Sequence, residues 1–265
     1  MTMSLPSYGK PPVYEVALAV QFETDRPLSS ADLASIRSLL EPDYPIVRDM
    51  PPLGRMTTDL ERTVEFEFSS TPPVPRYWFL SQDESHLVQL QRDRIAVNWR
   101  RQGNDPYPRY DTIKPRLEKA WTLLVQHLGE FGYEEPRPDV AEVTYVNPIE
   151  ATPGIWEQPS ELGAVFKPWS GDLNDELHAE LKTAALNLQF TLPGTDGGLR
   201  ATVQPAMNNE TGRAALMLTL VARGNAENET FQGALRFLDI GHEAIVRTFT
   251  ALTTNEMHTH WERIQ

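Results

Sequence analysis

The residues best suited to chemistry form a basic, partly aromatic stretch between Arg92 and Arg116. Seven arginine and lysine residues lie there against three aspartates, although the whole chain carries a net charge of −13. Guanidinium groups match the geometry of carboxylates and phosphates, and arginine and aromatic side chains are enriched at the centres of interfaces. The stretch therefore indicates a binding surface for a phosphate, a carboxylate or an acidic partner. The residues assigned to this candidate site are Arg92, Arg94, Trp99, Arg100, Arg101, Arg109, Tyr110 and His242.

The basic stretch also has a simpler interpretation. Its arginines could be solvated residues on the faces of strands, paired with nearby acids such as Glu65 and Glu67. Exposed charge is usually ordinary surface, and exposed ion pairs contribute little to stability. Both interpretations stay open at the level of the sequence.

His242 is the histidine with the most suggestive position, because it falls on the apolar stripe of an expected helix and precedes Glu243. It could act as an acid–base residue or a ligand, or it could be a histidine at the edge of the core that bonds to a neighbour. No second catalytic group lies at a meaningful spacing, which favours the core-edge interpretation. We therefore predict no catalytic residue.

Metal and cofactor motifs are not evident. His258 and His260 are two positions apart, and side chains at that spacing do not face each other on a helix. The acidic run at residues 172–176 lacks the glycine and the terminal glutamate of a calcium loop, and acids at the positive end of a helix explain it better. No phosphate-binding loop, nucleophile elbow or zinc-protease helix occurs. We expect no cofactor and no metal.

Composition narrows the class of protein. The 265 residues are 40% hydrophobic and 23% charged, as in ordinary globular proteins. No apolar run approaches the ~20 residues of a membrane span, and residues 1–12 lack the pattern of a secretory signal. The absence of cysteine excludes disulfides and thiolate sites and fits a cytoplasmic location. The acidic net charge makes nucleic-acid binding unfavourable and favours a basic partner, and it leaves self-association open.

Hydrophobic periodicity predicts antiparallel strands and long helices in both halves of the chain. An alternating pattern predicts strands, and an apolar stripe with capping residues predicts helices, the first of them capped by Ser29. The expected strands are residues 13–22, 64–68, 76–82, 85–91, 94–100, 140–146, 181–192, 199–204 and 214–221. The expected helices are residues 29–40, 111–131 and 229–252, with a short final helix from about Thr253.

These elements predict an α+β fold of two sheet-and-helix modules, in which antiparallel sheets are each covered by a long amphipathic helix. The modules are residues 1–150 and 151–265, and they could equally form one continuous domain. The segment 150–168 is the best candidate for a boundary, because it is irregular and rich in proline.

Several segments together resemble a sporadically distributed family of bacterial proteins of roughly this length and unknown function. They include the opening strand from Pro11, the hairpin between Leu87 and Arg101, the segment Tyr107 to Tyr110, and the segment Tyr145 to Ile149. The closing part, from Gly241 to Trp261, belongs to the same set, so the resemblance covers nearly the whole chain. It transfers no activity, but the patchy occurrence of the family implies genes that move horizontally, as in defence or toxin–antitoxin loci.

The sequence supports two hypotheses of function. The first is a non-enzymatic, acidic interaction protein, such as an antitoxin, an immunity protein or an anti-phage defence accessory, whose partner has a basic surface or is a toxin or effector. The second is a small-ligand-binding protein or an enzyme with a pocket between sheet and long helix. In that case Arg100, Arg109, Tyr110 and His242 would converge on one polar pocket.

Overall fold

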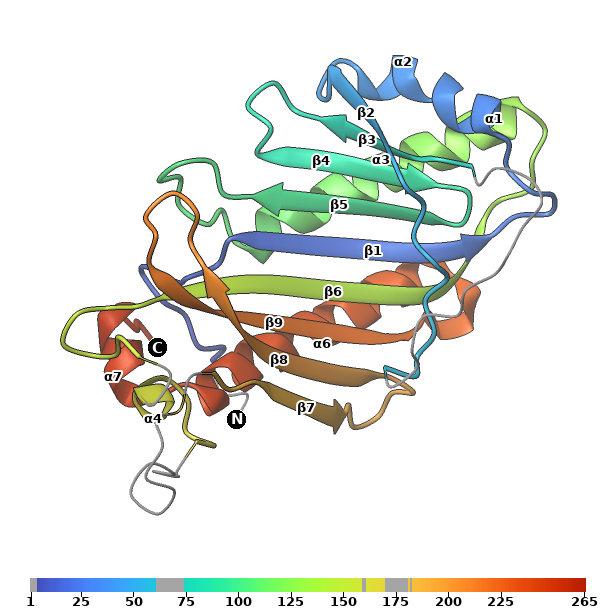
Figure 1. Cartoon of the computed structure of the whole chain (residues 1–265). Helices are drawn as coiled ribbons and strands as arrows, with labels where there is room; N and C mark the ends of the chain where they lie inside the picture. Colours follow the sequence, from blue (N-terminus) through green and yellow to red (C-terminus); the bar gives the residue numbers. More distant parts are fainter. Residues whose placement is uncertain (1–3, 61–73, 159–160, 170–180, 182) are drawn as a thin grey trace.

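A computed structural model of the chain describes residues 4–60, 74–158, 161–169, 181 and 183–265. The strand expected at residues 64–68 and the acidic run at residues 172–176 lie outside these ranges. The described strands form one nine-stranded sheet in the order β2-β3-β4-β5-β1-β6-β9-β8-β7, and all neighbours are antiparallel. The fold thus combines helices with one antiparallel sheet, and strands from both halves of the chain share it (Figure 1).

Five of the described strands come from the first half of the chain and four from the second half. The bounds are β1 Glu15–Glu23, β2 Ile46–Met50, β3 Arg76–Leu80, β4 His86–Gln91, β5 Arg94–Arg100, β6 Arg137–Glu150, β7 Leu186–Thr191, β8 Gly198–Met207 and β9 Ala214–Asn225. Alternation in β1 shows why these segments become strands. Val16, Leu18 and Val20 are fully buried on one face, whereas Glu15 and Ala17 point to the other.

Two long helices cover the same face of this sheet. Helix α3 (Tyr110–Glu130) packs against β1 and β5, and helix α6 (Phe231–Leu252) packs against β6, β8 and β9. Figure 1 shows both helices behind the sheet. The other helices of the described residues are short: α1 Ser30–Ser35, α2 Arg37–Leu40, α4 Leu162–Val165, the 3₁₀ turn η2 Glu227–Glu229 and α7 Asn255–His260. No helix in the described residues is both long enough and apolar enough to cross a membrane.

The two long helices touch each other along an antiparallel seam. Trp121 of α3 stacks on Phe231 at the start of α6, with ring centroids 4.7 Å apart. One part of the seam is polar, because Lys114 of α3 pairs with Asp239 of α6 at 2.7 Å. Tyr110, the first residue of α3, reaches only as far as His242, about halfway along α6. The second half of α6 therefore extends beyond the beginning of α3.

Local details differ from the sequence prediction in several places. Strand β7 begins at Leu186 and not at residue 181, and β6 extends beyond residues 140–146 at both ends. The helix expected at residues 29–40 divides at Ile36 into α1 and α2, where Leu39 N donates to Ile36 O in a tighter turn. Strand β2 lies between the helix expected at residues 29–40 and the strand expected at residues 64–68, where the sequence pattern predicts no strand. It is an edge strand with little burial, so its pairing with β3 decides its structure more than its own pattern. The last helix is capped by Thr254, one residue later than expected.

Trp121 ties the sheet to both long helices, and its removal provides a test of the packing. The side chain is 4% exposed and also meets the edge of Phe22 in β1. We expect Trp121→Ala to lower the free energy of unfolding by about 3–5 kcal/mol, because it leaves a large cavity. Chemical denaturation measures this loss. Phe190→Ala is the control, since Phe190 is 44% exposed, and an equal loss in both variants would contradict the packing described.

Candidate functional site

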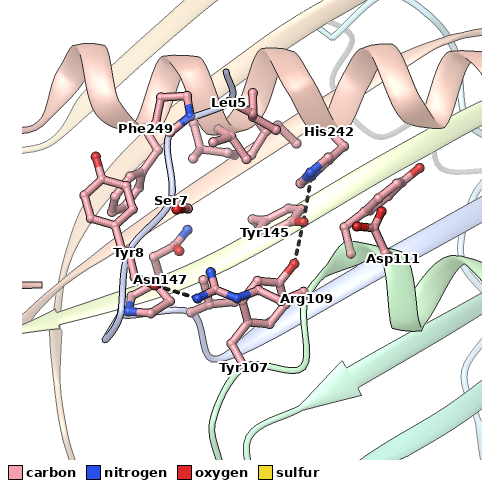
Figure 2. A pocket seen from close by; sticks show the side chains of 17 residues that line it. Leu5, Ser7, Tyr8, Tyr107, Arg109, Asp111, Tyr145, Asn147, His242 and Phe249 are labelled. Carbon is pink, nitrogen blue, oxygen red and sulfur yellow. Dashed lines mark hydrogen bonds between the residues drawn. The ribbon is translucent and has the colours of Figure 1, made fainter. Parts of the chain in front are cut away.

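One candidate site is a cavity of about 360 Å³ at the N-terminal end of α3. It lies where α6 extends beyond α3, between α6, strand β6 and the chain around residues 5–13 (Figure 2). Its apolar wall consists of Leu5, Pro11, Val13, Leu220, Ile245 and Phe249. The volume is near the lower end of the ~300–1,000 Å³ range of small-molecule sites.

Residues 5–13 close one side of the cavity because the C-terminal end of the chain holds them. Gly9 N donates to Glu262 O at 2.9 Å, and Ile264 N donates to Ser7 O at 2.8 Å. Tyr8 is buried against Phe249, with ring centroids 5.5 Å apart, and its hydroxyl lies 2.9 Å from Thr250 Oγ1. The two ends of the described chain thus build this wall together.

A chain of three polar side chains runs across the other side of the cavity. The Tyr107 hydroxyl lies 2.8 Å from the Tyr145 hydroxyl, which lies 2.9 Å from His242 Nδ1. Figure 2 shows this chain linking the loop before α3, strand β6 and helix α6. The ring of Tyr110 stacks on the imidazole of His242, with ring centroids 4.1 Å apart and an angle of 2° between the ring planes. The Tyr110 hydroxyl donates to Asp239 at 2.9 Å, so the stack is fixed at both ends.

Burial keeps this polar chain neutral near pH 7. It lowers the pKa of His242 to about 4, against the opposing effect of the carboxylates of Asp111, Asp239 and Glu243. Burial also raises the pKa values of Tyr107 and Tyr145 above that of free tyrosine. A neutral chain has two proton arrangements, since each hydrogen bond can run in either direction. The Tyr107 hydroxyl at its end can therefore either donate or accept.

Arg109 stands at the rim of the cavity with a strained backbone. It is the N-cap residue of α3 and has φ 76° and ψ 154°, a region that is almost restricted to glycine. Its Nη2 donates to Tyr8 O at 2.7 Å, so the side chain spans the mouth, as Figure 2 shows. No carboxylate of the described residues forms an ion pair with Arg109.

The predicted site residues do not gather at one place in the fold. Arg109, Tyr110 and His242 line the cavity, and Trp99 packs behind it against Tyr107, with ring centroids 5.5 Å apart. The rest lie elsewhere, because alternate residues of a strand face opposite sides. Arg94 and Arg100 lie on the face away from the long helices, Arg92 bonds to Leu28 O, and Arg101 bonds to Pro11 O. Arg100 does not join the other three residues expected in the pocket.

Sequence reasoning missed the central residues of the cavity. Tyr145 shares the helix-facing side of β6 with Val143 and Ile149, and a buried tyrosine in an otherwise aliphatic alternation is a weak signal of a polar site. Asn147 is 1% exposed and donates to Leu218 O at 3.1 Å. Tyr107 comes from an irregular loop whose position depends entirely on tertiary structure, so no local pattern could place it.

No protein-family model matches the sequence, and no match is found among curated proteins. Within the described ranges, no group of three or more histidine, aspartate or glutamate side chains is arranged to hold a metal ion.

The depressed pKa of His242 predicts loss of stability in mild acid. A histidine with a folded pKa of about 4 binds its proton more readily when unfolded, so stability falls as pH drops from about 6.5 toward 4. Between pH 7 and pH 5, we expect the free energy of unfolding to fall by about 1 kcal/mol less in His242→Phe than in the native protein, after allowance for partial exposure of the imidazole. Denaturation at both pH values measures the difference. His260→Phe, at an exposed position, is the control, and equal behaviour of the two variants would contradict the assignment.

The backbone of Arg109 predicts an unusual order of stability. Arg109→Gly and Arg109→Ala both remove the guanidinium, but only glycine relieves the strain at φ 76°. We expect the glycine variant to be more stable than the alanine variant by about 1–3 kcal/mol, as measured by thermal or chemical denaturation. The usual order, with alanine more stable, would show that the conformation of Arg109 is not strained in solution.

Proposed function

We propose that the protein binds a small amphipathic molecule in the cavity at the start of α3. The observation that carries the proposal is the neutral chain Tyr107–Tyr145–His242, which lines a cavity that is otherwise mostly apolar. A few convergent polar groups on an apolar wall are the usual composition of a small-molecule site.

The polar end of the ligand is best matched by a carboxylic acid. Arg109 offers a guanidinium that has no acid partner among the described residues, and it stands beside Tyr107 at the rim. A carboxylate could accept from Arg109 and from the Tyr107 hydroxyl together, because the neutral chain can direct a proton outward. Asp111 at the same rim disfavours a second negative charge, which favours a monocarboxylate over a dianion.

The apolar end of the ligand would lie against α6 and the N-terminal segment. Ile245, Val246 and Phe249 come from successive turns of α6, and Leu5 and Pro11 face them from residues 5–13. Such a wall stabilises a short alkyl chain or one ring by burying apolar surface. The cavity volume of about 360 Å³ restricts the ligand to a small molecule.

Hexanoate and hexan-1-ol are suitable probes, because they differ only in the charged head. We expect hexanoate to raise the melting temperature, and Arg109→Gln to weaken hexanoate binding about ten-fold with little effect on hexan-1-ol. Val246→Phe should weaken both probes by filling the cavity. Val125→Phe is the matched control, since Val125 is equally half-buried on α3 but lies outside the cavity. Hexanoate binding that is unaffected by Val246→Phe would refute the proposed site.

A role as an acidic interaction protein is the second candidate. It is supported by the 37 acidic residues against 24 basic ones, and the resemblance favours a defence or toxin–antitoxin setting. A basic partner would be attracted through long-range electrostatics and released at high ionic strength. Co-purification from the native host at low and at high salt tests this role. A partner that is not basic, or one retained equally at both salt concentrations, would argue against it.

We also propose that the chain consists of two related modules. Support comes from the order of the elements in each half. The first unit begins with β1, its last strand β5 pairs beside β1, and helix α3 follows. The second unit begins with β6, its last strand β9 pairs beside β6, and helix α6 follows. This order favours a junction between α3 and β6, earlier than the boundary near residue 150 that the proline-rich segment favours. The modules would then share one sheet through the pairing of β1 with β6.

A further inference from the structure

The face of the sheet opposite α3 and α6 carries an independent set of charged residues. We call this surface the open face. Its charged residues are Glu15, Arg76, Arg94, Arg100, Glu142, Arg200 and Arg223. Its uncharged residues include Ala17, Ala19, Gln21, Trp78, Gln89, Gln91, Ala96, Asn98 and Thr144. The register alternates these residues with the buried ones that face the helices. The small alanine side chains at the centre of the open face leave a depression in the surface there.

Residues 53–60, which we call the crossing segment, pass over one part of the open face (Figure 1). Side chains of the sheet bind the backbone of the crossing segment. The amide side chain of Gln91 accepts from the backbone N–H of Leu53 and donates to its carbonyl, and Gln21 forms the same pair of bonds with Met56. Arg94, Arg223 and Arg200 donate to the carbonyls of Gly54, Thr57 and Leu60. The segment is therefore anchored to β4, β5, β1, β9 and β8.

Beside Leu53 the open face keeps a cavity of about 240 Å³. Its floor is formed by Ala17, Ala19 and Ala96, and Arg76 and Arg94 stand on one side of it. Glu15 and Glu142 stand on the other side.

The carboxylates at this cavity already have cationic partners. Glu15 forms an ion pair with Arg100 at 3.2 Å, and Glu142 forms one with Arg223 at 2.5 Å. The next acids, Asp93 and Asp139, pair with Arg55 at 3.8 and 2.6 Å. The acids near the cavity are thus accounted for without Arg76 or Arg94.

Arg76 and Arg94 bond only to neutral oxygens. Arg76 Nη1 donates to Gln89 at 2.7 Å, and Arg94 Nη2 donates to Gly54 O. Neither forms an ion pair with any acid of the described residues, and the Nε atom of each is buried without a hydrogen bond. Arg94 is only 8% exposed. The cavity is therefore lined by two arginines without ion-pair partners, whereas its two glutamates are paired with Arg100 and Arg223.

Two guanidinium groups without ion-pair partners are costly in a partly dry site. Burial lowers the pKa of both arginines. Repulsion from Arg94 and Arg100 lowers the pKa of Arg76 further, whereas attraction to Glu142 and Asp93 opposes the lowering for Arg94. Guanidinium groups stay charged in proteins, so the repulsion persists unless an anion compensates it. The hydrogen bond from Arg94 to Gly54 O explains why an arginine is present at position 94, because it anchors the crossing segment. It does not explain why a second arginine, Arg76, lines the same cavity.

We propose that this cavity binds a small anionic group, a phosphate or a carboxylate, between Arg76 and Arg94. Planar guanidinium forks hold such groups through paired, charge-assisted hydrogen bonds. The carrier of the group would be a small molecule, because the crossing segment and the low volume leave little room beside Leu53. The site is separate from the cavity at α3 and does not depend on the function proposed there.

Calorimetry with the intact chain tests the proposal with three probes: inorganic phosphate, adenosine monophosphate and acetate. We expect phosphate to bind at low ionic strength and to bind less tightly as salt rises. Tighter binding of the nucleotide would identify a phosphate ester as the ligand, and tighter binding of acetate would identify a carboxylate. No measurable binding of any probe would overturn the proposal.

Variants separate this site from general attraction to a protein surface. Arg76→Gln should weaken phosphate binding about ten-fold, whereas Arg213→Gln in an exposed turn should leave it unchanged. Glu142→Gln should tighten binding about three-fold, because it removes a competing negative charge. Arg94→Gln is less informative alone, since it also releases Gly54. Equal affinity of Arg76→Gln and the native protein would refute the site, and hexanoate binding should be the same in both.

Discussion

The pairing of β1 with β6 is the interaction on which the rest of the structure depends. It joins strands from both halves into one sheet, with Leu18 opposite Val143 and Val16 opposite Tyr145. Because the sheet is continuous, the helices that follow each half cover the same face and meet along the Trp121–Phe231 and Tyr110–His242 contacts. The antiparallel seam ends where α3 begins. The cavity lies at that point, where α6 continues alone and residues 5–13 complete the wall.

Burial determines the chemistry of this cavity. The low dielectric environment of the seam keeps the imidazole and the phenols neutral, so the hydrogen bonds of Tyr145 join uncharged groups. The charges of Arg109 and Asp111 remain at the rim, where water can reach them. The strained backbone of Arg109 is consistent with a rim residue whose position is imposed by the surrounding structure. This division, neutral inside and charged at the mouth, suits recognition of a small acid better than general acid–base catalysis at neutral pH.

One basic stretch of sequence serves two opposite faces of the sheet. In β5, Trp99 points toward the helices while Arg94 and Arg100 point away from them. On the open face, a hydrogen-bonded row from Arg76 through Gln89 and Asn98 to Glu15 lies next to the crossing segment. The clustering of charge in the sequence therefore does not correspond to one cluster in space. Arg76, which lies outside the basic stretch, joins Arg94 only because β3, β4 and β5 are neighbours in the sheet.

The sequence by itself determined the elements whose pattern is complete within one segment. The alternation of β1, the apolar stripe of α3 and the cap at Ser29 follow from local periodicity and capping, and the structure has them at the expected positions. Tertiary structure decided what depends on a partner far along the chain. The edge strand β2 exists through β3, the sheet is single through β1 and β6, and Tyr107 meets Tyr145 and His242 only after folding. A local pattern specifies which face of an element is apolar, but long-range packing specifies which two faces meet.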